Sequence, residues 1–182
     1  MQQRPPAEHP RWRVTSGHSD PGTVERLLRS LPDWFGIESS IIGYIESAGR
    51  LPTYLAWRDP GPADSGRLPA GVLLAARHFP CSAEIYLMAV DPAVHRQGVG
   101  CALVAALEAD LIADRVEFLQ VKTLGAARRH AGYDRTRQFY ASVGFQPLEE
   151  INGLWPENPC LIMIKTLRQC WATGADPGAA AP

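Results

Sequence analysis

A glycine turn between an apolar strand and an Ala/Leu-rich helix is the feature that most constrains how this chain can fold. The segment Val90-Asp-Pro-Ala-Val-His-Arg-Gln-Gly-Val-Gly-Cys-Ala-Leu103 leaves a strand, is interrupted by Pro92 and enters a helix at about Gly98. Glycines here let the backbone approach a ligand closely, and the unpaired N–H groups of a helix N-terminus favour an anion such as phosphate. A G-x-G pattern alone is equally typical of a tight strand-to-helix connection, so both interpretations stay open at this point.

Two familiar phosphate-binding loops do not fit this turn. No Gly-Lys-Ser/Thr triplet follows it, as a Walker loop requires. Leu103 stands where a dinucleotide-binding fingerprint places its third glycine. The sequence therefore favours neither ATP nor NAD.

The segments around the turn predict a single-domain α/β fold with a mixed, mostly antiparallel sheet. Hydrophobic periodicity predicts helices from Asp20 to Leu31 and over 38–48, 97–114 and 136–143. It predicts strands over 11–15, 53–57, 70–77, 83–90, 118–121, 146–149 and 160–165. The strand, helix and strand between 83 and 121 form a βαβ unit, so these two strands are expected to be parallel. The Gly/Pro-rich connector over 59–69 is expected to be a hairpin loop.

The composition indicates one soluble domain with one active site. A chain of 182 residues with 46% apolar content suits a single core, and we expect it over 11–169, between flexible segments at 1–10 and 170–182. The formal net charge of −1 supplies no field toward nucleic acid or an anionic membrane. No apolar run approaches roughly 18 residues, and the first ten residues lack the apolar core of a signal peptide. We therefore expect a cytoplasmic protein with no nucleic-acid or membrane partner.

The cysteines do not form the pattern of a metal or redox site. No C-x-x-C pair occurs, so we expect no bound metal and reduced thiols at all four positions: Cys81, Cys101, Cys160 and Cys170. Cys101 lies beside the glycine turn, which leaves a nucleophilic role open. Small buried thiols are common in cores, however, and that is the alternative interpretation.

Two motifs in order resemble those of a known enzyme family. His95-Arg-Gln-Gly-Val-Gly100 and the helix after it resemble motif A of the GNAT superfamily of N-acetyltransferases, written Q/R-x-x-G-x-G/A. Phe139-Tyr-Ala-Ser-Val-Gly-Phe145 resembles motif B, and the resemblance covers about residues 70–165. It implies that the strand before motif A splays from the strand after it, with acyl-CoA in the gap and its pyrophosphate on the helix N-terminus.

The resemblance implies acetyl-CoA or another acyl-CoA as co-substrate. Backbone N–H groups are expected to hold the pyrophosphate whatever side chain stands at His95, where the family usually has Gln or Arg; an imidazole can still donate to a phosphate. The end of the preceding strand is expected to lie along the pantetheine arm. The implied cofactor-binding set is Met88, Ala89, Val90, His95, Arg96, Gln97, Gly98, Val99, Gly100, Cys101 and Tyr140.

Direct acetyl transfer from a thioester to an amine in a ternary complex needs a base and an acid, because an alkyl amine is only about 0.1% neutral at pH 7. Tyr140 falls on the tyrosine of motif B, which implies the acid that protonates the thiolate; the alternative is a core aromatic residue. Glu84 is the only charged residue in its strand and lies about 20 Å before Val90, comparable to a pantetheine arm. It is the candidate base. The alternatives are a surface residue paired with an arginine, and ordered water as the base.

Two loops carry the candidate residues for the amine substrate. The loop over 31–36 joins the first two helices and the loop over 153–159 joins the last two strands, where the resemblance implies the substrate pocket. The expected substrate-binding residues are an aromatic wall and one acid that attracts an ammonium: Trp34, Phe35, Trp155 and Glu157. Loop aromatics that fold back onto the core are the alternative.

The partner of the reaction stays open in the sequence. We expect a small amine-bearing molecule, with a homodimer considered only by analogy with such folds. A protein N-terminal or lysine acetyltransferase remains an alternative. A catalytically silent acyl-CoA sensor is another, because the glycine turn would bind CoA without either catalytic residue.

Overall fold

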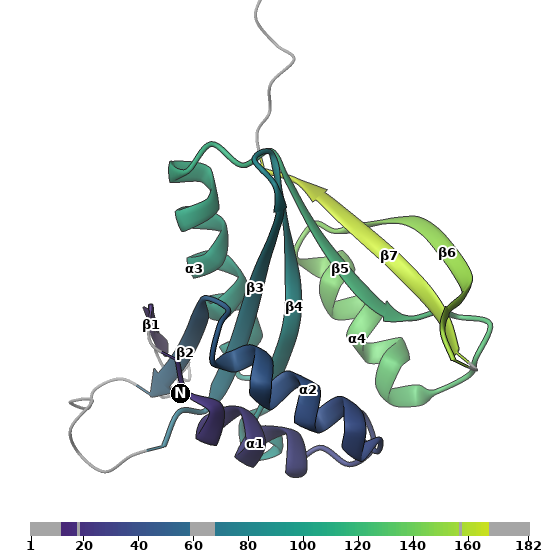
Figure 1. Cartoon of the computed structure of the whole chain (residues 1–182), viewed down its shortest axis with the longest axis horizontal. Helices are drawn as coiled ribbons and strands as arrows, with labels where there is room; N and C mark the ends of the chain where they lie inside the picture. The colour runs from purple at the N-terminus through teal and green to yellow at the C-terminus, as the bar shows by residue number, and fades with distance from the viewer. Residues whose placement is uncertain (1–11, 18, 59–67, 157, 168–182) are drawn as a thin grey trace, which may run out of the picture.

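The computed structural model describes residues 12–17, 19–58, 68–156 and 158–167, and within them one seven-stranded sheet is covered by helices on both faces (Figure 1). The strand order is β1-β2-β3-β4-β5-β7-β6. The strands are β1 (Trp12–Ser16), β2 (Thr53–Arg58), β3 (Gly71–Phe79), β4 (Ser82–Val90), β5 (Phe118–Leu124), β6 (Gln146–Trp155) and β7 (Asn158–Thr166). The helices are α1 (Pro21–Arg29), α2 (Glu38–Ala48), the 3₁₀ turn η1 (Pro92–Val94), α3 (Val99–Ala113) and α4 (Ala131–Ser142).

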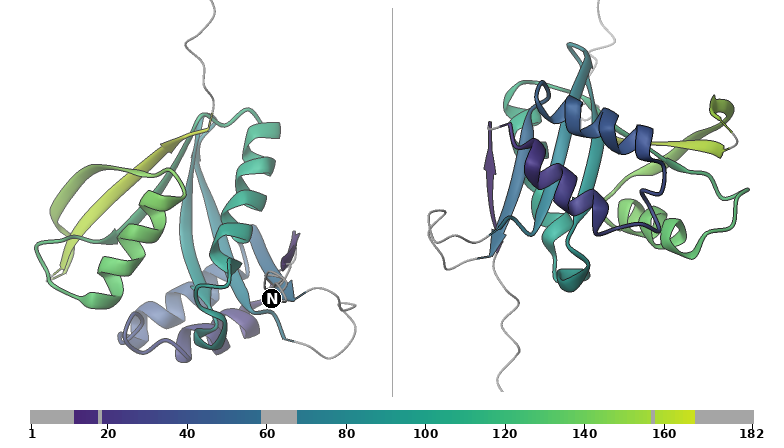
Figure 2. Two further views of the ribbon diagram at one scale, coloured as in Figure 1. Left: turned by 180° about the vertical axis from the view of Figure 1, so that it is seen from behind. Right: turned by 60° about the horizontal axis from the view of Figure 1, so that its bottom comes forward.

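Two apolar layers hold the helices to the sheet. Helices α3 and α4 cover one face, and α1 and α2 cover the other (Figure 2). Adjacent residues Leu73 and Leu74 of β3 point into opposite layers, and both are fully buried. Strands buried on both faces read as continuous apolar runs, which explains the sequence of β3.

Local sequence signals account for the ends of several helices. Asp20 caps α1 by accepting the N–H of Thr23 at 2.9 Å, with Pro21 at the first helical position. Helix α2 has the predicted limits. In α3 the buried residues Leu103, Leu107 and Leu111 form one stripe against the sheet. The predicted α/β class with a mixed sheet is confirmed.

Two predicted boundaries differ most from the structure. Helix α4 begins at Ala131 and not at Thr136, because His130 caps it by accepting the N–H of Tyr133 on Nδ1 at 3.4 Å. Histidine is not among the usual N-cap residues, so the sequence does not mark this start. Strand β6 continues to Trp155, well beyond the predicted Glu149, because its register shifts break the alternation that predicts a strand.

The two central strands are parallel but only partly paired. Pairing of β4 with β5 runs from Ser82 opposite Phe118 to Ile85 opposite Val121, whereas both strands continue further. The register of β3 against β4 shifts next to Ile85, between Leu74 and Ala75, and this leaves Tyr86 as a bulge. The strands diverge beyond it (Figure 1), so the predicted splay is confirmed.

Several predictions concern residues outside this description. The expected flexible segments at 1–10 and 170–182 and most of the connector over 59–69 fall there. Strands β2 and β3, which the connector joins, are antiparallel neighbours as a hairpin requires. Among the described helices, none has the length and apolarity needed to cross a membrane.

Replacing Gly71 by Val is expected to lower the free energy of unfolding by about 1–3 kcal/mol. A Cβ at Gly71 would lie 2.7 Å from Cγ1 of Val99 and 3.1 Å from Cδ1 of Leu103, so α3 would have to move off β3. The measurement is urea unfolding. Gly43→Ala is the matched control, because a Cβ there meets nothing within 4 Å, and it should stabilise α2 by about 0.5–1 kcal/mol. Unchanged stability in Gly71→Val would contradict this close contact.

Candidate active site

A cavity of about 1010 Å³ lies where β4 and β5 diverge, bounded by the turn before α3, by α4 and by the loop between α1 and α2. It brings together nearly all of the predicted site residues. Those that line it are Trp34, Phe35, Glu84, Met88, Ala89, Val90, His95, Arg96, Gly98, Val99, Gly100, Cys101, Tyr140 and Trp155. Gln97 does not line it, and Glu157 lies outside the described residues.

The glycine turn presents backbone N–H groups to this cavity. Gly98 is the N-cap of α3, with φ +88°, and its carbonyl accepts the first helical hydrogen bond from Ala102 at 3.0 Å. The N–H groups of Val99, Gly100 and Cys101 therefore have no partner within the helix, and the N-cap supplies no side-chain bond. This arrangement can bind an anion.

Side chains brace the turn from two directions. Trp12 Nε1 on β1 donates to the carbonyl of Gln97 at 2.6 Å. His95 Nε2 lies 2.8 Å from the carbonyl of Val90, and its ring meets Trp34 edge-on at 6.1 Å. Nε2 must carry a proton to donate to that carbonyl. A neutral His95 then has no second N–H group to donate to a phosphate. The predicted contact between His95 and the pyrophosphate therefore requires a protonated ring.

A close contact joins the two halves of the cavity. A Cβ on Gly100 would lie only 3.0 Å from Cζ of Phe139, and Phe139 meets Tyr140 edge-on at 5.2 Å. The glycine thus lets α4 pack against the first turn of α3. The segments 95–100 and 139–145, distant in sequence, become neighbours through this contact.

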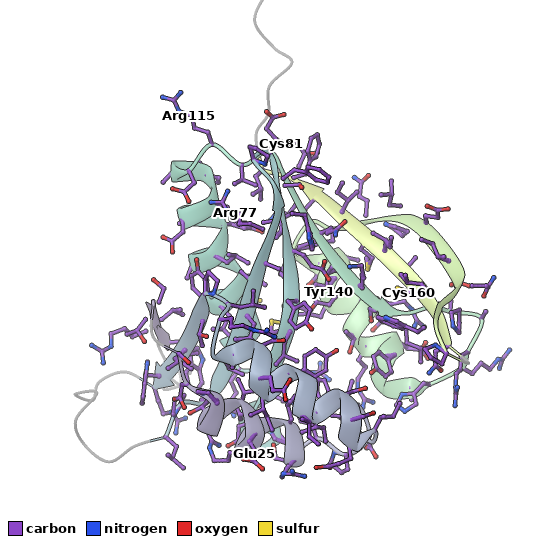
Figure 3. The ribbon with its side chains drawn as sticks, viewed as in Figure 1. Glu25, Arg77, Cys81, Arg115, Tyr140 and Cys160 are labelled. Atoms are coloured by element: carbon purple, nitrogen blue, oxygen red, sulfur yellow. The ribbon has the colours of Figure 1, made fainter. Side chains whose placement is uncertain are left out.

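Tyr140 is both a core residue and a cavity residue. It is 4% exposed, and Figure 3 shows it beside the gap between the β4 and β5 ribbons. Burial raises the pKa of Tyr140 well above the ordinary value for a tyrosine, so the phenol stays protonated at neutral pH. No side chain or backbone group among the described residues forms a hydrogen bond with its hydroxyl. The proton is therefore available to a bound ligand.

Glu84 lies in a polar cluster, although it is the only charged residue of an otherwise apolar strand. It is 4% exposed, and its Oε2 lies 2.6 Å from His78 Nε2, 2.8 Å from Lys122 Nζ and 3.2 Å from Gln120 Nε2. All three contacts are to Oε2, and Oε1 accepts no hydrogen bond from the described residues. The alternative of a surface glutamate paired with an arginine does not hold either.

Sequence reasoning missed the partners of Glu84. Gln120 stands opposite Glu84 in the parallel register, and Lys122 follows on the same face of β5. Two polar residues at alternate positions of an apolar strand were the available signal. His78 is reached through the β3–β4 hairpin, in which Ala76 pairs with Glu84, and only the register places it there.

The loop between α1 and α2 is tied to α4 across the cavity. Trp34 Nε1 donates to Thr136 Oγ1 at 3.3 Å, and Tyr133 Oη donates to the carbonyl of Trp34 at 3.0 Å. A Cβ at Gly132 would lie 2.9 Å from the Trp34 ring. Trp34 and Phe35 pack against the core and line the cavity at once, so the two interpretations of these aromatics are compatible.

The described cysteines, Cys81, Cys101 and Cys160, are free thiols. Cys101 is exposed and lines the cavity at the start of α3, whereas Cys160 is buried. Among the described residues, no group of three or more His, Cys, Asp or Glu side chains is arranged to hold a metal ion.

A comparison with models of known protein families identifies the family of the chain. The profile of the Acetyltransferase (GNAT) domain matches residues 52–147, which is more than half of the 182 residues and includes both motifs. The chain belongs to the GNAT acetyltransferase family. This GNAT protein is therefore an acyltransferase, and the resemblance seen in its motifs is confirmed. No curated protein matches it in sequence.

Solved structures with this fold cover nearly the whole domain. A GNAT-family protein from Desulfovibrio desulfuricans superposes with a TM-score of 0.70 at 18% identity, covering 87% of this chain and 99% of its own. The ribosomal-protein-S18-alanine N-acetyltransferase of Escherichia coli gives 0.66 at 17% identity, covering 94% and 100%. A GNAT acetyltransferase from Elizabethkingia anophelis with acetyl-CoA bound gives 0.63 at 14% identity, covering 85% and 97%. These similarities show a shared fold.

Proposed function

We propose that this GNAT protein transfers an acetyl group from acetyl-CoA directly to the amine of a small molecule. The observation that carries the proposal is one cavity lined by the glycine turn, the buried Tyr140 and the buried Glu84. The bound acetyl-CoA in the similar Elizabethkingia anophelis structure supports this donor. A ternary complex fits the size of the cavity, about 1010 Å³, which exceeds what one small ligand fills.

The donor is held mainly by backbone groups. Its pyrophosphate binds the N–H groups of Val99, Gly100 and Cys101, where the helix dipole adds to the attraction. The pantetheine arm lies along Met88, Ala89 and Val90, in the part of β4 that no longer pairs with β5. An extended chain can hydrogen-bond to a strand edge of this kind.

Glu84 accepts a proton from the ammonium group of the amine substrate. Lys122 and Gln120 hold Oε2, which leaves Oε1 for the substrate. His78, with a side chain 41% exposed, also contacts Oε2 and links the buried carboxylate with solvent. The proton thus has a route out of the cavity while both substrates are bound.

Tyr140 completes the reaction on the sulfur side. The neutral amine attacks the thioester carbonyl carbon, a C–N bond forms and the C–S bond breaks, and the nitrogen loses its second proton to water as the amide forms. The Tyr140 hydroxyl donates its proton to the departing thiolate and is reprotonated from solvent after product release. A phenol that burial keeps protonated suits this role.

The test is thiol release from acetyl-CoA with a panel of amines, and mass spectrometry of the products. We expect one free thiol for each acetylated amine. Binding of CoA without release by any amine would favour the acyl-CoA sensor. Release with peptides alone would favour a protein acetyltransferase.

Initial-rate patterns distinguish direct transfer of the acetyl group from transfer through an acetyl-cysteine intermediate. Direct transfer in a ternary complex predicts intersecting double-reciprocal lines. Parallel lines, together with a loss of activity in Cys101→Ala, would instead assign the nucleophile to Cys101.

The cytoplasmic location, the homodimer and the domain limits at 11–169 stay predictions.

A further inference from the structure

A row of aromatic rings lines the part of the cavity next to α2. Phe35 from the α1–α2 loop meets Tyr44 of α2 edge-on, with ring centroids 5.9 Å apart. Tyr44 meets Tyr86 of β4 in the same way at 5.6 Å. Tyr86 follows Glu84 by two positions on β4. We call Phe35, Tyr44 and Tyr86 the aromatic row; it runs from the loop to the strand that carries Glu84.

Tyr44, in the middle of the aromatic row, is half-buried, whereas Tyr86 at its end is 37% exposed. Burial raises the pKa of Tyr44 to about 12, with a smaller effect from the negative charges of Tyr86, Tyr133 and Glu84 when ionised. Burial also raises the pKa of Tyr133. A substrate that carries many hydroxyl or ammonium groups would lose part of their hydration beside these rings and gain few polar partners, chiefly the hydroxyls of Tyr44 and Tyr86. A flat apolar body loses nothing comparable and gains ring contacts.

The charges of the cavity favour one ammonium group. Glu84 is the only acidic side chain among the described residues that line it. Its Oε2 already binds Lys122, so the substrate meets a single carboxylate oxygen. A polyamine or an aminoglycoside carries several ammonium groups, and each further one would be buried without a counter-charge.

We infer that the amine substrate is a primary monoamine joined by a short alkyl arm to an aromatic or similarly flat apolar body. The inference rests on the proposed function, and it names the substrate class of that same site. The ammonium lies at Oε1 of Glu84, and the apolar body lies along the aromatic row.

The experiment compares kcat/KM for 2-phenylethylamine, benzylamine, hexylamine, spermidine, kanamycin and an alanine-initiated peptide at saturating acetyl-CoA. We expect the two arylalkylamines to exceed the other four by about tenfold or more, which corresponds to one additional set of ring contacts. A higher kcat/KM for spermidine, kanamycin or the peptide would overturn the inference and leave the acetyltransferase proposal intact.

Variants of the row test where the ring binds. Phe35→Leu and Tyr86→Leu are expected to raise the KM for 2-phenylethylamine about tenfold while leaving the KM for hexylamine and acetyl-CoA nearly unchanged. Phe79→Leu is the matched control, because Phe79 is 69% exposed and does not line the cavity. Equal losses for both amines would overturn the placement of the ring.

If the protein releases no thiol with any amine, the binding of 2-phenylethylamine to the CoA-saturated protein is measured by calorimetry. Binding that Phe35→Leu weakens would keep the inferred site and overturn the proposed reaction. Absence of binding would overturn both.

Discussion

Tyr140→Phe is expected to lower kcat by about 10²- to 10⁴-fold, the usual contribution of a general acid. The change removes one hydroxyl and keeps the ring that packs edge-on against Phe139 at 5.2 Å and Phe145 at 5.4 Å. The KM for acetyl-CoA should stay nearly constant, because backbone groups of the glycine turn hold the donor. The measurement is thiol release at saturating concentrations of both substrates.

The pH dependence of this effect follows from burial. Burial raises the pKa of Tyr140, so its acid form is present on both sides of neutrality and persists above pH 10, where an ordinary tyrosine ionises. The wild-type profile should therefore show no basic limb due to Tyr140 below about pH 10. The same shift makes its contribution to stability complete below about pH 10 and lost as the pH rises further, because the unfolded chain ionises first.

The controls for Tyr140→Phe are its thermal unfolding and its affinity for CoA, both of which should resemble those of the wild type. A variant with unchanged kcat at every pH would show that Tyr140 is a core aromatic without a catalytic role. Reduced kcat together with reduced stability would point to packing instead.

Glu84→Gln is expected to lower kcat/KM for the amine by about 10²- to 10⁴-fold near pH 7. Glutamine has nearly the same shape and keeps an oxygen for Lys122, but its amide does not accept the proton of an ammonium group. The neutral fraction of an alkyl amine rises tenfold per pH unit below a pKa of about 10. The ratio of wild-type to variant activity should therefore narrow as the pH rises from about 6.5 toward 10.

Glu108→Gln is the matched control for Glu84→Gln. Glu108 on α3 also binds a lysine, with Oε1 2.5 Å from Lys165 Nζ, but it does not line the cavity. Glu108→Gln should lower the free energy of unfolding and leave the pH dependence of kcat/KM unchanged. A constant activity ratio for Glu84→Gln across the pH range would assign Glu84 a structural role and leave the base to ordered water.

Much of the fold could be predicted because short-range signals repeat at the right spacing. Asp20 before Pro21 marks the start of α1, and leucines four positions apart mark the buried stripe of α3. The start of α4 could not be predicted, because it depends on a cap by His130. Gly132 in its first turn leaves room for the Trp34 ring, which comes from a distant part of the chain.

The candidate site also has features that the sequence shows and features that only the tertiary structure shows. The glycine turn and the tyrosine at position 140 are visible in the sequence, since a turn that exposes backbone N–H groups needs glycines in one short segment. The packing of Phe139 on Gly100 and the edge-to-face row of Phe35, Tyr44 and Tyr86 join segments far apart in the chain. No local pattern encodes such contacts.

The sequence by itself determined the order of the elements and the position of the glycine turn, because these depend on periodicity and spacing along the chain. Its two motifs indicated the family through their resemblance to those of known members. Only the tertiary structure decided the environment of Glu84. The parallel register brings Gln120 and Lys122 to it from β5, and the β3–β4 hairpin brings His78. Residues on three strands meet there because strand register, a property of the assembled sheet, sets which side chains become neighbours.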